Sequence, residues 1–66
     1  MKIKLNGQET ETCEAGTILA LLENYGLKDK PLVVELNGSI IKRGQYDEAR
    51  LNEGDVLEIV RLVGGG

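Results

Sequence analysis

Three glycines, Gly64-Gly65-Gly66, close the sequence and are the residues whose types and spacing most directly suggest chemistry. The run before them, 56–63, is apolar and typical of a β-strand. We therefore expect a compact domain over residues 1–63 and a flexible glycine tail over residues 64–66. Because glycine has no side chain, the reactive group that this tail offers is the α-carboxylate of Gly66.

A carboxylate is a poor electrophile until an ATP-using partner converts it to an acyl-adenylate. Sulfur or another nucleophile can then attack the activated carbonyl of Gly66. Gly64 and Gly65 would let the tail enter a narrow active site, since glycine adopts backbone conformations that other residues avoid. The partner would supply positioning and electrostatics. The alternative is a flexible chain end without a function.

Other kinds of site have weaker support. No helix follows the glycines to bind a phosphate with its N-terminal amides. The chain has no His and one Cys, so we expect no metal site. The lone Cys13 excludes an intrachain disulfide and fits a reducing compartment. Its preferred interpretation is a small buried apolar residue, because a nucleophilic cysteine needs a nearby base.

Length and charge limit the function classes further. The chain has 66 residues and a net charge of −3, which argues against nucleic acid and suggests a partner with a basic docking face. The longest apolar run, 18–22, is too short to cross a bilayer, and the N-terminus has no signal-peptide pattern. We expect a cytoplasmic protein that is monomeric when free.

The first third of the chain reads as a hairpin followed by a helix. Alternating apolar residues predict a strand over 1–5, Asn6-Gly7 predicts a tight turn, and 8–13 is the returning strand at a solvated edge. Thr17 is the expected N-cap of a helix over 18–25. Its apolar stripe would comprise four residues: Ile18, Leu21, Leu22 and Tyr25.

Gly26 is expected to end this helix in a left-handed conformation, with Leu27 packing back on Leu22. Further strands are predicted over 32–36 and 39–41, joined by a second turn at Asn37-Gly38. Residues 42–51 read as irregular, with at most one short helical turn.

The predicted fold class is α+β, with a mixed sheet of four to five strands packed on one main helix. The last strand is the most apolar and is placed centrally. If it lies beside the first strand and parallel to it, the arrangement is a β-grasp.

One face of the last strand must pack against the helix, and the other must lie on the open side of the sheet. Burying Glu58 without a partner would be costly, so Leu57 and Ile59 are expected to face the helix. Val60 and Leu62 would then lie on the open face beside the tail, where exposed apolar side chains suit partner docking. The alternative is a strand whose exposed apolar groups have no such role.

Five segments, in this order and spacing, carry a family resemblance: Met1-Lys2-Ile3-Lys4-Leu5-Asn6-Gly7, Thr17-Ile18-Leu19-Ala20-Leu21-Leu22, Val34-Glu35-Leu36-Asn37-Gly38, Gly54-Asp55-Val56-Leu57-Glu58-Ile59-Val60 and Val63-Gly64-Gly65-Gly66. Together they resemble the ThiS family, the sulfur-carrier proteins of thiamine biosynthesis. The resemblance covers essentially the whole chain and implies a β-grasp, ubiquitin-like fold.

The resemblance also implies a carrier that is not itself an enzyme and binds no cofactor of its own. An E1-like, ThiF-like adenylyltransferase would use ATP to adenylate Gly66. Sulfur that comes ultimately from cysteine, through a donor system such as a cysteine desulfurase, would give a thiocarboxylate. A ThiG-like thiazole synthase would then take the sulfur to build the thiazole phosphate of thiamine.

The chain departs from the family pattern near its candidate docking residues. Many relatives have Pro-Arg where this chain has Lys42-Arg43, often a Trp near Tyr46, and a Phe where Leu62 stands. Arg43 and an aromatic residue at Tyr46 are kept. Arg43 joins Val60 and Leu62 as a candidate partner contact, and a plain surface charge is the alternative.

Three other functions stay open at this point. The small subunit of molybdopterin synthase is a related sulfur carrier that also ends in Gly-Gly, although it is usually longer. A ubiquitin-like modifier would join its terminal glycine to lysines of target proteins. A plain interaction domain would not use the tail at all.

Overall fold

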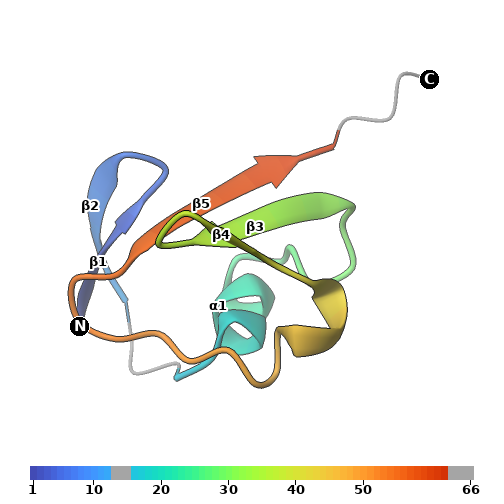
Figure 1. Cartoon of the computed structure of the whole chain (residues 1–66), viewed down its shortest axis with the longest axis horizontal. Helices are drawn as coiled ribbons and strands as arrows, with labels where there is room; N and C mark the ends of the chain where they lie inside the picture. Colours follow the sequence, from blue (N-terminus) through green and yellow to red (C-terminus); the bar gives the residue numbers. More distant parts are fainter. Residues whose placement is uncertain (13–15, 63–66) are drawn as a thin grey trace.

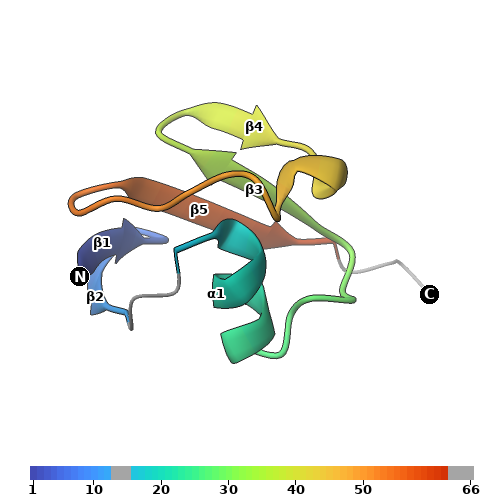
Figure 2. The ribbon, with the colours of Figure 1, turned by 90° about the horizontal axis from the view of Figure 1, so that it is seen from below.

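The computed structural model describes residues 1–12 and 16–62. Over these ranges, five strands and one α-helix form two layers, with the helix against one face of the sheet (Figures 1 and 2). The elements are β1 (Lys2–Leu5), β2 (Gln8–Glu11), α1 (Ile18–Asn24), β3 (Leu32–Leu36), β4 (Ser39–Ile41), the 3-10 helix η1 (Arg43–Gln45) and β5 (Val56–Arg61). The predicted α+β class is confirmed.

The sheet has the strand order β2-β1-β5-β3-β4. The last strand is therefore central, as predicted. It runs parallel to β1, which is the condition set for a β-grasp, and antiparallel to β3. Both hairpins turn at Asn-Gly pairs whose residues all have positive φ: Asn6, Gly7, Asn37 and Gly38. This topology is the predicted β-grasp, and β2 lies at one edge as expected.

Both ends of α1 are capped as predicted. The Thr17 hydroxyl accepts a hydrogen bond from the Ala20 amide at 3.2 Å. At the other end, Gly26 has a φ of 69° and the Leu27 amide donates to the Leu22 carbonyl at 2.8 Å. This is a Schellman motif, which uses carbonyls that the helix leaves unpaired.

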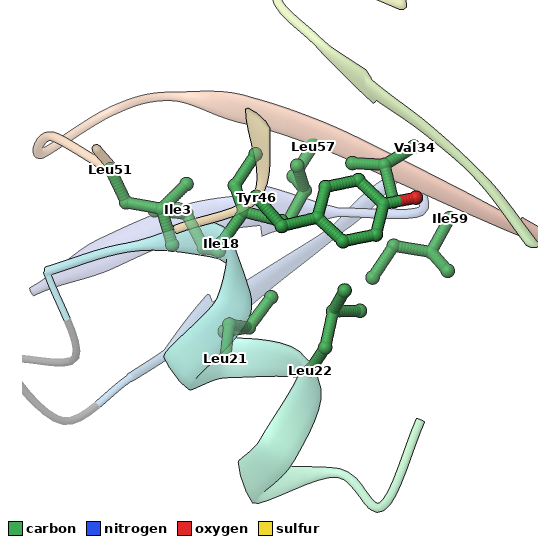
Figure 3. Close-up of a cluster of buried hydrophobic side chains, with 9 residues drawn as sticks. All are labelled: Ile3, Ile18, Leu21, Leu22, Val34, Tyr46, Leu51, Leu57 and Ile59. Atoms are coloured by element: carbon green, nitrogen blue, oxygen red, sulfur yellow. The ribbon is translucent and has the colours of Figure 1, made fainter. Parts of the chain in front are cut away.

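The hydrophobic core lies between α1 and the sheet (Figure 3). Ile18, Leu21 and Leu22 of α1 are buried, as predicted, but Tyr25 is 47% exposed. The prediction for Tyr25 was wrong because α1 ends at Asn24 and Tyr25 is its C-cap. Within the part of the chain that the structure describes, nine residues are buried: Ile3, Ile18, Leu21, Leu22, Val34, Tyr46, Leu51, Leu57 and Ile59.

Tyr46 supplies the aromatic part of this core. It directly follows η1, which is the short helical turn expected in the irregular segment, and only 5% of its surface is exposed. The Leu19 amide donates to the Tyr46 carbonyl at 2.9 Å and so fixes this segment against α1. The ring fills the space beside Leu22, Val34 and Ile59 (Figure 3).

The two asparagine turns also bind β5 through their side chains. The Asn6 Oδ1 accepts from the Ile59 amide at 2.8 Å, and its Nδ2 donates to the Ile59 carbonyl at 3.3 Å. On the other side, the Asn37 Oδ1 accepts from the Val56 amide at 2.9 Å. The side chain of each turn asparagine thus adds hydrogen bonds to β5 directly after β1 or β3 has ended.

We expect Asn6→Gly to lower the free energy of unfolding by about 2 kcal/mol, since each lost hydrogen bond costs about 1 kcal/mol. Glycine keeps the left-handed turn conformation, so the loss reports mainly on the two bonds to Ile59. Chemical denaturation at equilibrium measures it.

Asn37→Gly is the matched control, because it makes the same change at the same position of the other turn. Its bonds to Val56 and Asp55 are exposed, whereas those of Asn6 are partly buried. The amide of Val56 can therefore bond to water instead, and the loss should be smaller. Equal losses would contradict a special role for Asn6.

Tyr46→Ala should cost about 3 kcal/mol or more, because it leaves a cavity in the core. Tyr46→Phe should change stability by less than about 0.5 kcal/mol. The Tyr46 hydroxyl forms no hydrogen bond with the described residues. Since every buried side-chain N or O among those residues has a hydrogen-bond partner, this hydroxyl is not buried and can bond to water. Thermal denaturation of both variants tests this; a phenylalanine variant as unstable as the alanine variant would contradict it.

Candidate functional site

The predicted reactive tail lies outside the described residues, and so do Val63 and Cys13. What the structure describes is the end of β5, up to Leu62, from which that tail continues. The division into a domain over 1–63 and a tail over 64–66 stays a prediction.

The backbone at the end of β5 is bound on its β3 side. The Leu62 amide donates to the Pro31 carbonyl at 2.9 Å, one residue beyond the last residue of β5. The neighbouring Lys30 carbonyl accepts from Arg43 Nη2 at 3.2 Å. The extended backbone that Pro31 imposes before β3 therefore presents two successive carbonyls, one to β5 and one to η1.

Val60 and Leu62 lie on the open face, 53% and 52% exposed, while Leu57 and Ile59 are buried on the side of α1, as predicted. Val60 of β5 lies opposite Val33 of β3, and Ile40 of β4 lies opposite Glu35 of β3 on the same face of the sheet. These side chains form what we call the open-face patch: Val33, Ile40, Val56, Val60 and Leu62. Exposed apolar groups gathered on one face are typical of docking surfaces.

Two carboxylates lie within this patch. Glu35 and Glu58 lie directly opposite each other on β3 and β5. Like charges in this position destabilise a sheet by a few tenths of a kcal/mol. The patch is therefore apolar with an acidic centre, which complements a partner surface that carries a basic group.

Arg43 does not share the open face with Val60 and Leu62. It lies on η1, on the same side of the sheet as α1 (Figure 1). Its hydrogen bond to Lys30 ties η1 to the loop that also binds Leu62. Arg43 thus lies in the helical layer, near the same end of β5 as Leu62. Its contact with a partner remains a prediction.

Among the described residues, the hydroxyls of Thr10 and Thr12 donate to backbone carbonyls, and no Ser, Thr or Tyr hydroxyl is hydrogen-bonded to a carboxylate. A shallow hollow of about 360 Å³ borders β1 and the start of β5. Its charged side chains are Lys2, Lys4, Glu9 and Glu53, with Lys2 Nζ 3.9 Å from Glu9 Oε1. Within the same described ranges, no three His, Cys, Asp or Glu residues gather as metal ligands. No helix there is long and apolar enough to cross a membrane.

Sequence reasoning missed the side-chain roles of both turn asparagines. It used Asn6 and Asn37 only as residues that tolerate positive φ. The available signal was that both turns use Asn, whose amide can both donate and accept, whereas Asp cannot donate when ionised. Their common target, β5, could only be found from the sheet order.

The sequence model of the ThiS family matches residues 2–66. The chain is 43% identical over 65 residues to the sulfur carrier protein ThiS of Bacillus subtilis, covering 97% of this chain and 98% of that protein. It is also 38% identical over 66 residues to a thiazole synthase of Paramagnetospirillum magneticum and 43% identical over 67 residues to one of Magnetococcus marinus. The match covers this whole chain but spans only 20% of each thiazole synthase.

The fold has a close counterpart among solved structures. The crystal structure of the thiamine biosynthesis protein ThiS from Geobacter metallireducens superposes with a TM-score of 0.84 at 28% identity, covering 100% of both chains. The family match over nearly the whole sequence, the full-length Bacillus relative and the β-grasp topology agree. The chain belongs to the ThiS family.

Proposed function

We propose that this protein is a sulfur carrier of thiamine biosynthesis that works through the carboxylate of Gly66. The observation that carries the proposal is the match at 43% identity to a sulfur carrier protein ThiS over almost the whole of both chains. The described fold supports it, since β5 runs from the core to an exposed end at Arg61, and only Leu62 and Val63 separate that end from the glycines in the sequence. In this proposal the protein is a carrier and not a catalyst, and it is located in the cytoplasm.

The chemistry proceeds in three steps on the Gly66 carboxylate. A carboxylate oxygen attacks the α-phosphate of ATP in an E1-like adenylyltransferase, forming an acyl-adenylate and releasing pyrophosphate. The terminal sulfur of a persulfide, loaded by a cysteine desulfurase system, then attacks the acyl carbon, and AMP leaves as the C–S bond forms. A thiol reduces the resulting acyl disulfide and becomes part of a new disulfide as the carrier is released. The product is a thiocarboxylate, and the carrier itself needs no metal or bound cofactor for any step.

A thiazole synthase is the proposed acceptor of this sulfur. Two thiazole synthases contain a stretch similar to this entire chain, and a domain fused to an enzyme in some species is expected to bind that enzyme in others. Gly64 and Gly65 would thread into the active sites of both partners. Val60, Leu62 and Arg43 would contact the partners outside those sites.

The direct test is the intact mass of the protein after incubation with ATP, the cognate adenylyltransferase and a sulfur donor. We expect a gain equal to the replacement of one oxygen by sulfur, located at Gly66 by fragmentation. A variant with one residue added after Gly66 should show no gain, because its glycine carbonyl is then an amide. An unchanged mass of the native chain with a demonstrably active partner would reject the carrier function.

The contact role of the open-face patch has its own test. Val60→Ser and Leu62→Ser should each weaken binding to the adenylyltransferase by about tenfold, which corresponds to about 1.4 kcal/mol of lost apolar burial. Isothermal titration calorimetry measures the affinity. Both side chains are about half exposed, so the melting temperature should change little.

Tyr25→Ser is the matched control for these two variants. Tyr25 is exposed to a similar extent, at 47%, but lies at the end of α1 instead of on the open face. Its loss should leave the affinity unchanged. If Tyr25→Ser weakened binding as much as Val60→Ser, the docking surface would lie elsewhere.

A further inference from the structure

The backbone of β5 presents hydrogen-bonding groups to both of its neighbours in alternation. In an antiparallel pair, every second residue bonds to the partner strand and the residues between them point away. The bond between the Leu62 amide and the Pro31 carbonyl places Leu62 in the set that faces β3. The amides and carbonyls of Leu57, Ile59 and Arg61 therefore face the side of β1.

The first two of these three residues have partners on that side. The Leu57 carbonyl accepts from the Asn6 amide at 2.9 Å. Both backbone groups of Ile59 bond to the Asn6 side chain. Asn6 is the last point of contact, because the chain turns there into β2 and away from β5.

Arg61 comes next and lies beyond that hairpin. Figure 1 shows β5 extending past the β1–β2 hairpin toward the C-terminal end. Arg61 pairs in register with Leu32 of β3 alone, and its N–H and C=O point away from β3. Within 1–12 and 16–62, no group bonds to them from the other side, so β5 is a central strand for its first four residues and an edge strand at Arg61.

The side chains around this edge define what would fit it. Val60 and Leu62 flank it on the open face, both about half exposed. The Arg61 side chain is on the opposite face, is exposed, and forms no ion pair with the described carboxylates. A matching segment is extended, apolar toward the open face, and carries a carboxylate on the side of Arg61.

We propose that the backbone of Arg61 binds an extended segment of thiazole synthase, which adds to the sheet at this edge and places a carboxylate against the guanidinium. This assignment rests on the proposed function, which makes that enzyme the partner. Strand addition gives affinity through main-chain bonds and specificity through alternate side chains. It would also fix the direction in which β5 leaves the domain toward the enzyme.

A second copy of this chain fits the same edge poorly. Two-fold antiparallel pairing centred on this residue would set Arg61 opposite Arg61, and like charges directly opposite each other are destabilising. Each chain also carries a net charge of −3, which adds to the repulsion. A partner segment that sets a carboxylate opposite Arg61 avoids the first of these penalties and replaces it with an attraction.

Amide hydrogen exchange followed by NMR on the ¹⁵N-labelled chain tests the proposal. In the free protein the Arg61 amide should exchange rapidly, while the Leu62 amide is protected by its bond to Pro31. Saturation with unlabelled thiazole synthase should slow exchange at Arg61 by at least about tenfold and leave Leu62 protected. Equally fast exchange of Arg61 in the saturated complex would overturn the proposal.

A pair of variants separates the backbone from the side chain. Arg61→Pro removes an N–H that has no partner within residues 1–12 and 16–62. It should weaken binding to thiazole synthase by about tenfold with little change in melting temperature. Arg61→Ala keeps the N–H and should cost less than Arg61→Pro. If both variants bound alike, the backbone pairing would be refuted. If Arg61→Pro fails to fold, the exchange experiment on the native chain decides the question.

The remaining outcomes identify a different occupant. Protection of Arg61 in a concentrated sample without enzyme would assign the edge to a second copy. Protection by the adenylyltransferase and not by thiazole synthase would assign it to the activating enzyme. Either result overturns the proposal but leaves the carrier function intact, because the sulfur-dependent mass gain at Gly66 is measured separately. A missing mass gain would instead reject the function itself.

Discussion

The structure depends on the bonding of β5, the central strand between two short neighbours. β1 ends at Leu5 and β3 begins at Leu32, so neither strand satisfies all of the backbone groups that β5 presents. The Asn6 side chain and the Pro31 carbonyl extend the bonding on the two sides. Because buried backbone groups without partners are costly, these two contacts allow a 66-residue chain to keep a central strand with such short neighbours.

Local chemistry explains why much of the fold could be predicted from the sequence. Each local signal acts through residues close to it in the sequence. This holds for the Asn-Gly turns, the Thr17 cap and the Gly26 helix end. The faces of β5 could be assigned because Glu58 cannot be buried alone while Leu57 and Ile59 gain from burial. The central position of β5 followed from its apolar composition, and the sheet order agrees.

Sequence reasoning was wrong about the burial of Tyr25 and missed contacts between distant parts of the chain. Tyr25 continues the helical period, but the helix ends before it, and Tyr46 fills the core from an irregular segment that has no period to read. At the candidate site, Val60 and Leu62 were placed on the correct face, whereas Arg43 lies in the other layer. No local pattern shows that the segment around η1 lies against α1, since the bond between the Leu19 amide and the Tyr46 carbonyl joins residues far apart in the sequence.

The two parts of β5 meet different physical demands. Its first four residues, from Val56 to Ile59, are bonded on both sides and carry Leu57 and Ile59 into the core, so change there affects stability. Its end is bonded on the β3 side and exposes three successive side chains from Val60 to Leu62. A small domain has little stability to spare, and a binding surface built from core residues would make every change of partner a change in folding. Placing the exposed groups beyond Ile59 separates the two demands within one strand, while Pro31 keeps that end attached to the sheet.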